Sequence, residues 1–211
     1  MRIDIISDTV CPWCYIGKRR LELALAARPD MVAEIFWHPF ELHPDMPDDG
    51  VPRDDFWLEK FGDEERSAKV VENICAAGAE IGIHFAFDRM ATIPNTARSH
   101  ALMRWAGEIG EQTAAAEALF RAYFEEGRDI GDLDVLADIA EGLGLSAEDA
   151  EVMIAGDTML SSVRHAAAQA SALGIEGVPC YIIGQKYALV GAQDPEKFLA
   201  VFDRIAAEEG E

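Results

Sequence analysis

Two cysteines stand between a strand pattern and a helix pattern, and this junction constrains the fold more than any other feature. Residues 2–7 are apolar enough for a buried parallel strand. The motif Cys11-Pro12-Trp13-Cys14 follows closely, and the next residues carry apolar side chains at helical spacing. The pattern predicts a strand that turns into a helix, with the first sulfur at the helix N-terminus.

This position suits a reactive thiol pair. At a helix N-terminus, unsatisfied N–H groups and the helix dipole stabilise a thiolate. Cys14 lies three residues after Cys11, on the same helix face and within reach of it. Pro12 fits the first helical position, where a missing N–H costs nothing. The pattern indicates thiol–disulfide exchange, in which an exposed Cys11 attacks and a shielded Cys14 resolves the mixed disulfide.

Half of a zinc site is the main alternative for a C-x-x-C motif. Zinc normally requires two further ligands from a second knuckle. The other two cysteines, Cys75 and Cys180, stand alone in the sequence. We therefore expect no metal site.

The charge of the chain excludes several classes of partner. The 211 residues include 39 Asp and Glu against 18 Lys and Arg, a formal net charge of −21. Such a surface repels phosphate backbones and anionic lipids, so we expect neither nucleic acid nor a membrane surface as a partner. We interpret the acidic surface as one that favours solubility.

No segment resembles a targeting signal or a membrane span. Met1-Arg2 is followed directly by the first strand, without a long apolar stretch or a small-residue cleavage site. No run of about 18 apolar residues occurs. Four cysteines, only two of them close in sequence, do not make a secreted disulfide framework. We expect a cytoplasmic protein, and in a reducing compartment a C-x-x-C motif is more often catalytic than structural.

The order of predicted elements indicates an α/β fold with a helical insertion. Strands are predicted at 2–7 and 34–38, on either side of the first helix, and at 180–183 and 187–190. The remaining helices are predicted at 53–61, 63–81, 95–109, 112–126, 132–142, 146–155, 158–173 and 195–207, with Thr158 as the N-cap of the helix over 158–173.

Removing the helical block leaves β-α-β-α-β-β-α, a thioredoxin fold with a central mixed sheet and helices on both faces. Residues 1–44 and 157–211 would form the thioredoxin-like domain, and 45–156 an inserted all-helical domain. We expect the inserted domain to cover the Cys11 sulfur and leave a cleft, because it follows the second strand, close to the active-site end of the sheet. Ligand sites also often lie between domains.

Several motifs together resemble the DsbA-like branch of the thioredoxin superfamily, and within it the FrnE-like group. They are Ser7-Asp8, residues 11–18, Pro39-Phe40-Glu41-Leu42, Asn95-Thr96, Gly177-Val178-Pro179 and Gly191-Ala192-Gln193. The resemblance covers the whole chain and implies a dithiol/disulfide oxidoreductase. It implies no tightly bound cofactor, glutathione as a candidate redox partner, and a disulfide-containing protein or small thiol as substrate. One departure is Cys180, where many relatives have Thr, Ser or an aromatic residue.

The resemblance also implies roles around the cysteines. Pro179 resembles the cis-proline of the fold, which would keep an N–H away from the cysteines and direct the Val178 backbone at a substrate strand. The alternative is an ordinary trans proline at the start of an edge strand. Pro12 and Trp13 are expected to tune the sulfur of Cys11. A substrate contact by Trp13 is favoured over packing alone, because aromatic side chains beside a reactive centre provide apolar binding area.

Two further candidates each have an alternative. Asp4 is either a buried carboxylate beneath the dithiol, acting as a proton relay for Cys14, or a residue at an exposed strand end. Cys180 is either a third redox thiol or a small buried hydrophobe, and the second is favoured because side chains alternate along a strand. We expect a structural role for His100 rather than a place in the cleft, and we assign Cys75 to the core of a helix.

Two other functions are compatible with these features. A glutathione-dependent isomerase or transferase of the kappa-class or 2-hydroxychromene-2-carboxylate isomerase type would share the fold, usually with serine at the first cysteine position. Cysteine at both positions 11 and 14 favours redox exchange instead. A chaperone-like binding protein would use an apolar groove of the helical domain.

Overall fold

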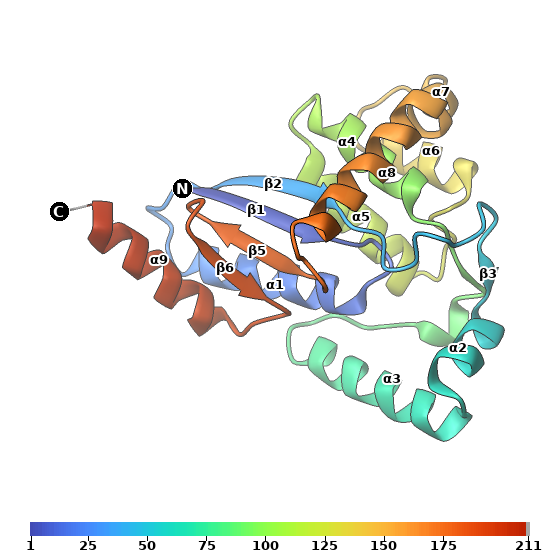
Figure 1. Ribbon diagram of the computed structural model, residues 1–211, viewed down its shortest axis with the longest axis horizontal. Coiled ribbons are helices and arrows are strands. Elements are labelled where there is room, and N and C mark those ends of the chain that lie inside the picture. The colour runs from blue at the N-terminus through green and yellow to red at the C-terminus, as the bar shows by residue number, and fades with distance from the viewer. Residues whose placement is uncertain (210–211) are drawn as a thin grey trace.

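The computed structural model describes residues 1–209 and shows a mixed sheet with helices on both faces (Figure 1). Within these residues the main sheet has four strands in the order β2-β1-β5-β6. β1 (Arg2–Ser7) pairs in parallel with β2 (Glu34–Pro39) and antiparallel with β5 (Cys180–Ile183). β6 (Tyr187–Val190) pairs antiparallel with β5. The predicted fold class is confirmed.

The helices follow the predicted order, and several of their ends have a visible cause. They are α1 (Pro12–Ala26), α2 (Arg53–Phe61), α3 (Glu64–Ala79), α4 (Ala97–Gly107), α5 (Gln112–Phe124), α6 (Leu133–Gly142), α7 (Ala150–Ala155), α8 (Asp157–Ala172) and α9 (Pro195–Glu209). Gly62 ends α2 with a φ of 82°, a left-handed conformation that glycine adopts without strain. The Asp132 side chain accepts from the N–H of Asp134 and caps α6. The N-cap of α8 is Gly156, so the predicted cap at Thr158 is wrong.

A short two-stranded sheet that we did not predict forms between the residues just before α2 and residues that follow α3. β3 (Val51–Pro52) pairs antiparallel with β4 (Thr92–Ile93). Two residues are too few to show a strand period, and a proline argues against a strand. A 3₁₀ turn, η1 (Phe87–Arg89), precedes β4.

The alternation of side chains along the strands separates two faces of the sheet. Ile3 and Ile5 belong to the main core, which also contains Tyr15 of α1 and Phe198 of α9. Tyr181 of β5 pairs with Ile5 and contacts Phe198 of α9 edge-on, with ring centroids 4.9 Å apart. The α1 helix therefore covers the Ile5 and Tyr181 face.

The opposite face carries a smaller apolar cluster. Ile6 and Cys180 pack there with Phe40 and with Ala170 of α8. Asp4, which alternates with Ile3 and Ile5, points to this face as well. Side chains on this face are thus separated from α1 by the sheet.

Helices α2 to α7 lie toward the end of the sheet where α1 begins (Figure 1). One hydrophobic cluster runs from Ile5 through Tyr15 of α1 to Phe120 and Phe124 of α5. Tyr15 stacks on Phe120 with ring centroids 5.2 Å apart. The division into 1–44 with 157–211 and 45–156 stays a prediction. None of the helices formed by the described residues has the length and apolar character needed to cross a membrane.

Candidate active site

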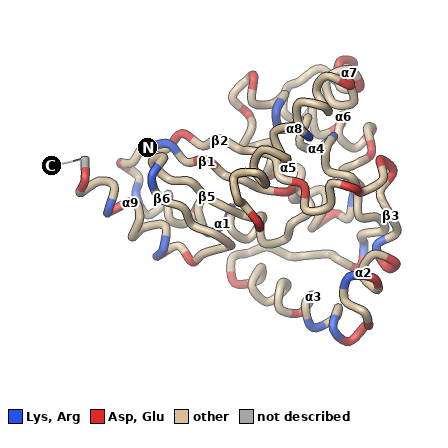
Figure 2. Tube along the Cα trace, viewed as in Figure 1, with Lys and Arg blue, Asp and Glu red and all other residues tan. Residues whose placement is uncertain are grey.

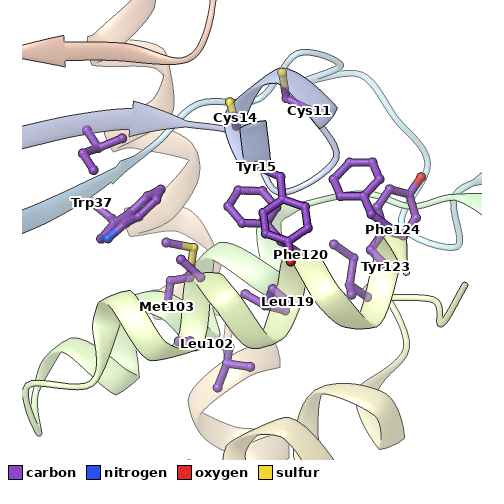
Figure 3. Close-up of a cluster of buried hydrophobic side chains, with 14 of the residues drawn as sticks. Cys11, Cys14, Tyr15, Trp37, Leu102, Met103, Leu119, Phe120, Tyr123 and Phe124 are labelled. Atoms are coloured by element: carbon purple, nitrogen blue, oxygen red, sulfur yellow. The ribbon is translucent and has the colours of Figure 1, made fainter. Parts of the chain in front are cut away.

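Cys11 and Cys14 lie together at the start of α1. Cys11 is the N-cap residue with an extended backbone, and Pro12 occupies the first helical position. The carbonyl of Cys11 accepts a hydrogen bond from the N–H of Cys14 at 3.0 Å. The two cysteine side chains project to the same side of the turn, whereas Tyr15 points toward Phe120 (Figure 3).

A cavity of about 350 Å³ opens at one of the two sulfurs. Cys11 lines this cavity together with Trp13 and Val178, and Cys14 does not. Both cysteines are buried, at 4% and 1% exposure, so the expectation of an exposed Cys11 is wrong. The asymmetry between the two thiols comes from the cavity, because only Cys11 forms part of its wall.

The backbone before β5 lies against Cys11. The Cys11 thiol donates a weak hydrogen bond to the carbonyl oxygen of Val178, with Sγ and O 3.7 Å apart. The Val178–Pro179 peptide bond is cis. A Cβ on Gly17 would lie 3.0 Å from Cγ of Pro179, so Pro179 packs against α1 one turn after Cys14. The structure brings these predicted site residues together.

Cys14 lies in surroundings that hold its proton. Burial raises its pKa well above the ordinary value, and the adjacent Cys11 raises it further. The Ser7 side chain and the Asp8 backbone hydrogen-bond Cys14 and act in the opposite direction. Two adjacent thiolates are unfavourable, so Cys11 adds to the effect of burial in holding the proton on Cys14.

Tyr181 lies beneath the dithiol, and neither its position nor its role was predicted. Its hydroxyl occupies the place where a side chain on Gly17 would stand. It is fully buried and has no hydrogen-bond partner within residues 1–209. Burial, followed by the charges of Cys14 and Cys11, raises the pKa of Tyr181 well above its ordinary value. Gly17 is required here because only glycine leaves room for the phenol oxygen.

Asp8 is a second residue that sequence reasoning missed. It is fully buried, and its Oδ2 accepts from the N–H of Leu42 at 2.7 Å. Its Oδ1 lies 3.4 Å from Nε2 of His100 and has no hydrogen-bond partner in the described part of the chain. His100 also contacts the carbonyl oxygen of Phe40 at 3.1 Å, in keeping with a structural role. In the sequence, Asp8 stands out only as part of the family motif.

Asp4 does not lie beside the dithiol. It is 8% exposed on the sheet face opposite α1, which also excludes an exposed strand end. Its carboxylate accepts from Arg2 at 2.7 and 2.6 Å and lies 2.7 Å from Nε2 of His38. The hydrogen bonds from Arg2, with a smaller effect of His38, hold the pKa of Asp4 below its usual value despite burial. The geometry gives no support to a proton relay from Cys14 to Asp4.

The remaining cysteines lie apart from the dithiol as well. Cys180 packs with Ile6 on the sheet face opposite α1, and burial raises its pKa. This position favours a small buried hydrophobe over a third redox thiol. Cys75 is half-buried in α3, outside the cavity wall, and burial raises its pKa too.

No metal centre is evident among the residues that the structure describes, where no group of three His, Cys, Asp or Glu side chains converges. His38 and His43 have a spacing that occurs in zinc sites. However, His38 pairs with Asp4, and His43 contacts the Phe56 ring edge-on at 4.8 Å.

The chain has a mixed sheet, a C-x-x-C motif at a helix start, and the backbone before β5 against the first sulfur. A comparison with protein families agrees with this arrangement. Residues 2–203 match the DSBA-like thioredoxin domain. The chain belongs to the DSBA-like thioredoxin domain family. The narrower FrnE-like assignment stays a prediction.

Individual relatives agree with this family. The probable DsbA oxidoreductase SCO1869 from Streptomyces coelicolor is 32% identical with a TM-score of 0.89, over 99% of this chain and 91% of that chain. The uncharacterized protein YwbO from Bacillus subtilis (strain 168) is 28% identical over 188 residues, 87% of each protein. The cytosolic disulfide reductase DsbM from Pseudomonas aeruginosa, solved with GSH, shares the fold at 20% identity and a TM-score of 0.68, over 98% of this chain and 100% of that chain.

Proposed function

We propose that this member of the family is a thiol–disulfide oxidoreductase that works through Cys11 and Cys14. One observation carries the proposal: two buried, adjacent thiols differ in access, because Cys11 lines a cavity and Cys14 does not. In this proposal Cys11 meets the substrate, and Cys14 attacks only Cys11.

The exchange balances with these two residues alone. The Cys11 thiolate attacks one sulfur of a disulfide R–S–S–R′, forms Cys11–S–S–R and releases R′–S⁻. Cys14 then loses its proton, attacks the sulfur of Cys11 and releases R–S⁻, and a leaving thiolate takes up the proton. The substrate gains two electrons, and the protein gains a Cys11–Cys14 disulfide. The reverse sequence would donate that disulfide to a dithiol.

The electrostatics around Cys14 make the two steps sequential. In the reduced protein, the hydrogen bond and the electrostatic effect of Cys11 help to hold the proton on Cys14. A mixed disulfide at Cys11 removes the electrostatic effect, which lowers the pKa of Cys14 at the moment when its thiolate is needed. The hydrogen bonds from Ser7 and the Asp8 backbone then favour the Cys14 thiolate.

A small thiol such as glutathione is the redox partner that we propose, with no tightly bound cofactor. The DsbM structure contains GSH and is named a cytosolic disulfide reductase, which supports both glutathione and a cytoplasmic location. The substrate would be a disulfide-containing protein or a small thiol compound. The net charge of −21 supports a role apart from nucleic acid and anionic membranes.

The test uses oxidised glutathione and intact-protein mass spectrometry. Reduced wild type should form an internal disulfide, Cys14→Ser should stop at a mixed disulfide on Cys11, and Cys11→Ser should form neither. The proposal fails if wild type and Cys11→Ser react at the same rate with the same products.

A further inference from the structure

The cavity beside Cys11 has a wall unlike the rest of the molecule. Asp and Glu are spread along most of the chain (Figure 2), and a separate hollow is lined by Asp48, Asp49, Asp129 and Asp132. By contrast, none of the described residues that line the Cys11 cavity is acidic, and most are apolar. The cavity where a substrate would meet the reactive sulfur therefore lacks the acidic character of the chain as a whole.

Lys60 supplies the charge of this wall. It is the only Lys or Arg among the described residues that line the cavity. Its Nζ lies 5.3 Å from the centroid of the Phe56 ring, and His43 contacts the same ring edge-on. Burial and then the charge of Lys60 lower the pKa of His43, which keeps this imidazole neutral near pH 7. The wall thus presents one cation among aromatic rings.

The surroundings of Lys60 favour an anionic ligand. Lys60 is an exposed residue, but the cavity wall covers part of its side chain. This partial burial lowers its pKa, and the nearby Cys11 and Asp8 act in the opposite direction. An ammonium group that has lost part of its hydration gains stabilisation when an anion binds beside it. Oδ2 of Asp8 accepts from Leu42 and Oδ1 faces His100, so neither oxygen forms an ion pair with Lys60.

We propose that the cavity binds one arm of a small anionic disulfide with an apolar or aromatic body, and that Lys60 binds its carboxylate. The inference rests on the proposed function and names its substrate class. A volume of about 350 Å³ is near the lower end for small-molecule sites, roughly 300–1,000 Å³. Rings such as Phe56 and Trp57 would pack on the body of the ligand, while Cys11 attacks its sulfur.

The reaction follows the balance given above. Cys11 displaces the outer arm as a thiolate and keeps the bound arm as a mixed disulfide. Cys14 then displaces the bound arm, so that one disulfide becomes two thiols and the protein becomes oxidised. Two molecules of a small thiol, the partner class already proposed, reduce the Cys11–Cys14 bond again.

Two chromogenic aromatic disulfides test the role of Lys60. Dithiobis(nitrobenzoate) carries carboxylates and dithiodipyridine is neutral, and only the reaction phase that is absent from Cys11→Ser is compared. Lys60→Gln should lower the ratio of the anionic to the neutral rate by about three- to fivefold, the upper part of the range for an ion pair with an exposed lysine. Lys60→Arg should keep the ratio within about twofold of wild type because the positive charge remains.

A matched control separates local charge from net charge. Lys197→Gln, on α9, makes the same change in net charge outside the cavity and should leave the ratio within about twofold. An unchanged ratio in Lys60→Gln, or an equal fall in Lys197→Gln, overturns the inference and leaves the proposed function standing. If neither reagent shows a phase that depends on Cys11, the proposed function itself fails.

A second variant tests whether the ligand occupies the cavity. Val70→Trp, on the cavity wall, should slow both aromatic disulfides at least about fivefold more than it slows alkylation by iodoacetamide, because the bulk removes binding space. Circular dichroism checks that the variant is folded. Equal slowing of all three reagents would mean that the substitution only restricts access to Cys11 and removes no binding site for the disulfides, which would overturn the inference.

Discussion

The Cys11 thiol donates to the carbonyl oxygen of Val178, 167 residues away in the chain and 3.7 Å away in space. This contact joins the start of α1 to the residue before Pro179. A thiolate or a mixed disulfide at Cys11 has no proton to donate, so the first step of the proposed exchange would release the Val178 carbonyl. That carbonyl would then be free to accept an N–H of a bound substrate.

We expect alkylation of the reduced, folded protein to label Cys11 before the other three cysteines. Cys11 lines the cavity, whereas burial raises the pKa of Cys14, Cys75 and Cys180. Peptide mapping after a short exposure to iodoacetamide near pH 7 measures the order. First labelling of Cys75 or Cys180 would contradict the site assignment.

Removing the Cys11 thiol should make Cys14 easier to ionise. The adjacent Cys11 is the second cause, after burial, of the raised pKa of Cys14. In Cys11→Ala, the pH profile of Cys14 alkylation should move to lower pH, yet stay above that of an exposed thiol because burial remains. Cys180 in the same variant serves as the internal reference. A profile that does not move would mean that the two sulfurs do not interact as the structure indicates.

Substitutions at Gly17 and Tyr181 should have coupled effects on the free energy of unfolding. Gly17→Ala places a methyl group against the Tyr181 hydroxyl and should cost about 1–3 kcal/mol of unfolding free energy. Tyr181→Phe removes a buried hydroxyl without a partner in the described residues, and should lie between neutral and about 1 kcal/mol stabilising. The double variant should recover part of the cost because the oxygen is gone. Denaturant unfolding of all four proteins completes the cycle, and strictly additive effects would contradict the contact.

Asp4 should matter for stability and not for exchange. Because Arg2 and His38 lower its folded pKa, the stabilising contribution is present above the unfolded pKa of about 3.9 and is lost as pH falls through the folded value. Asp4→Asn should therefore cost on the order of 1 kcal/mol at pH 7, with the difference from wild type shrinking below about pH 4. Its rate of reaction with oxidised glutathione should equal that of wild type. A slower resolving step in this variant would restore Asp4 as a proton relay.

The parts of the site that were predictable depend on residues close in sequence. Cys11 and Cys14 share one helical turn, and the proline at position 12 marks where that turn begins. The apolar residues over 2–7 also predicted β1, but they did not predict which face of the sheet α1 would cover. Because the covered face could not be predicted, Asp4 was expected beside the dithiol. In the structure, the sheet separates Asp4 from the two cysteines.

The residues that were missed depend on contacts between distant segments. Asp8 belongs to the site because His100 of α4 lies against its carboxylate. Tyr181 belongs to it because Gly17 of α1 leaves room for the Tyr181 hydroxyl. Lys60 appears in the sequence as one cation on an amphipathic helix. Only packing around the cavity sets it among aromatic rings on the same wall as Cys11.

A redox titration tests the central claim most directly. The protein is equilibrated in glutathione buffers of increasing oxidation, quenched with acid, and the bonded cysteines are identified by mass spectrometry of peptides. We expect one reversible two-electron transition that joins Cys11 to Cys14, with Cys75 and Cys180 remaining thiols throughout it. Failure of the Cys11–Cys14 bond to form in any buffer, or a transition that requires Cys180, would contradict the account.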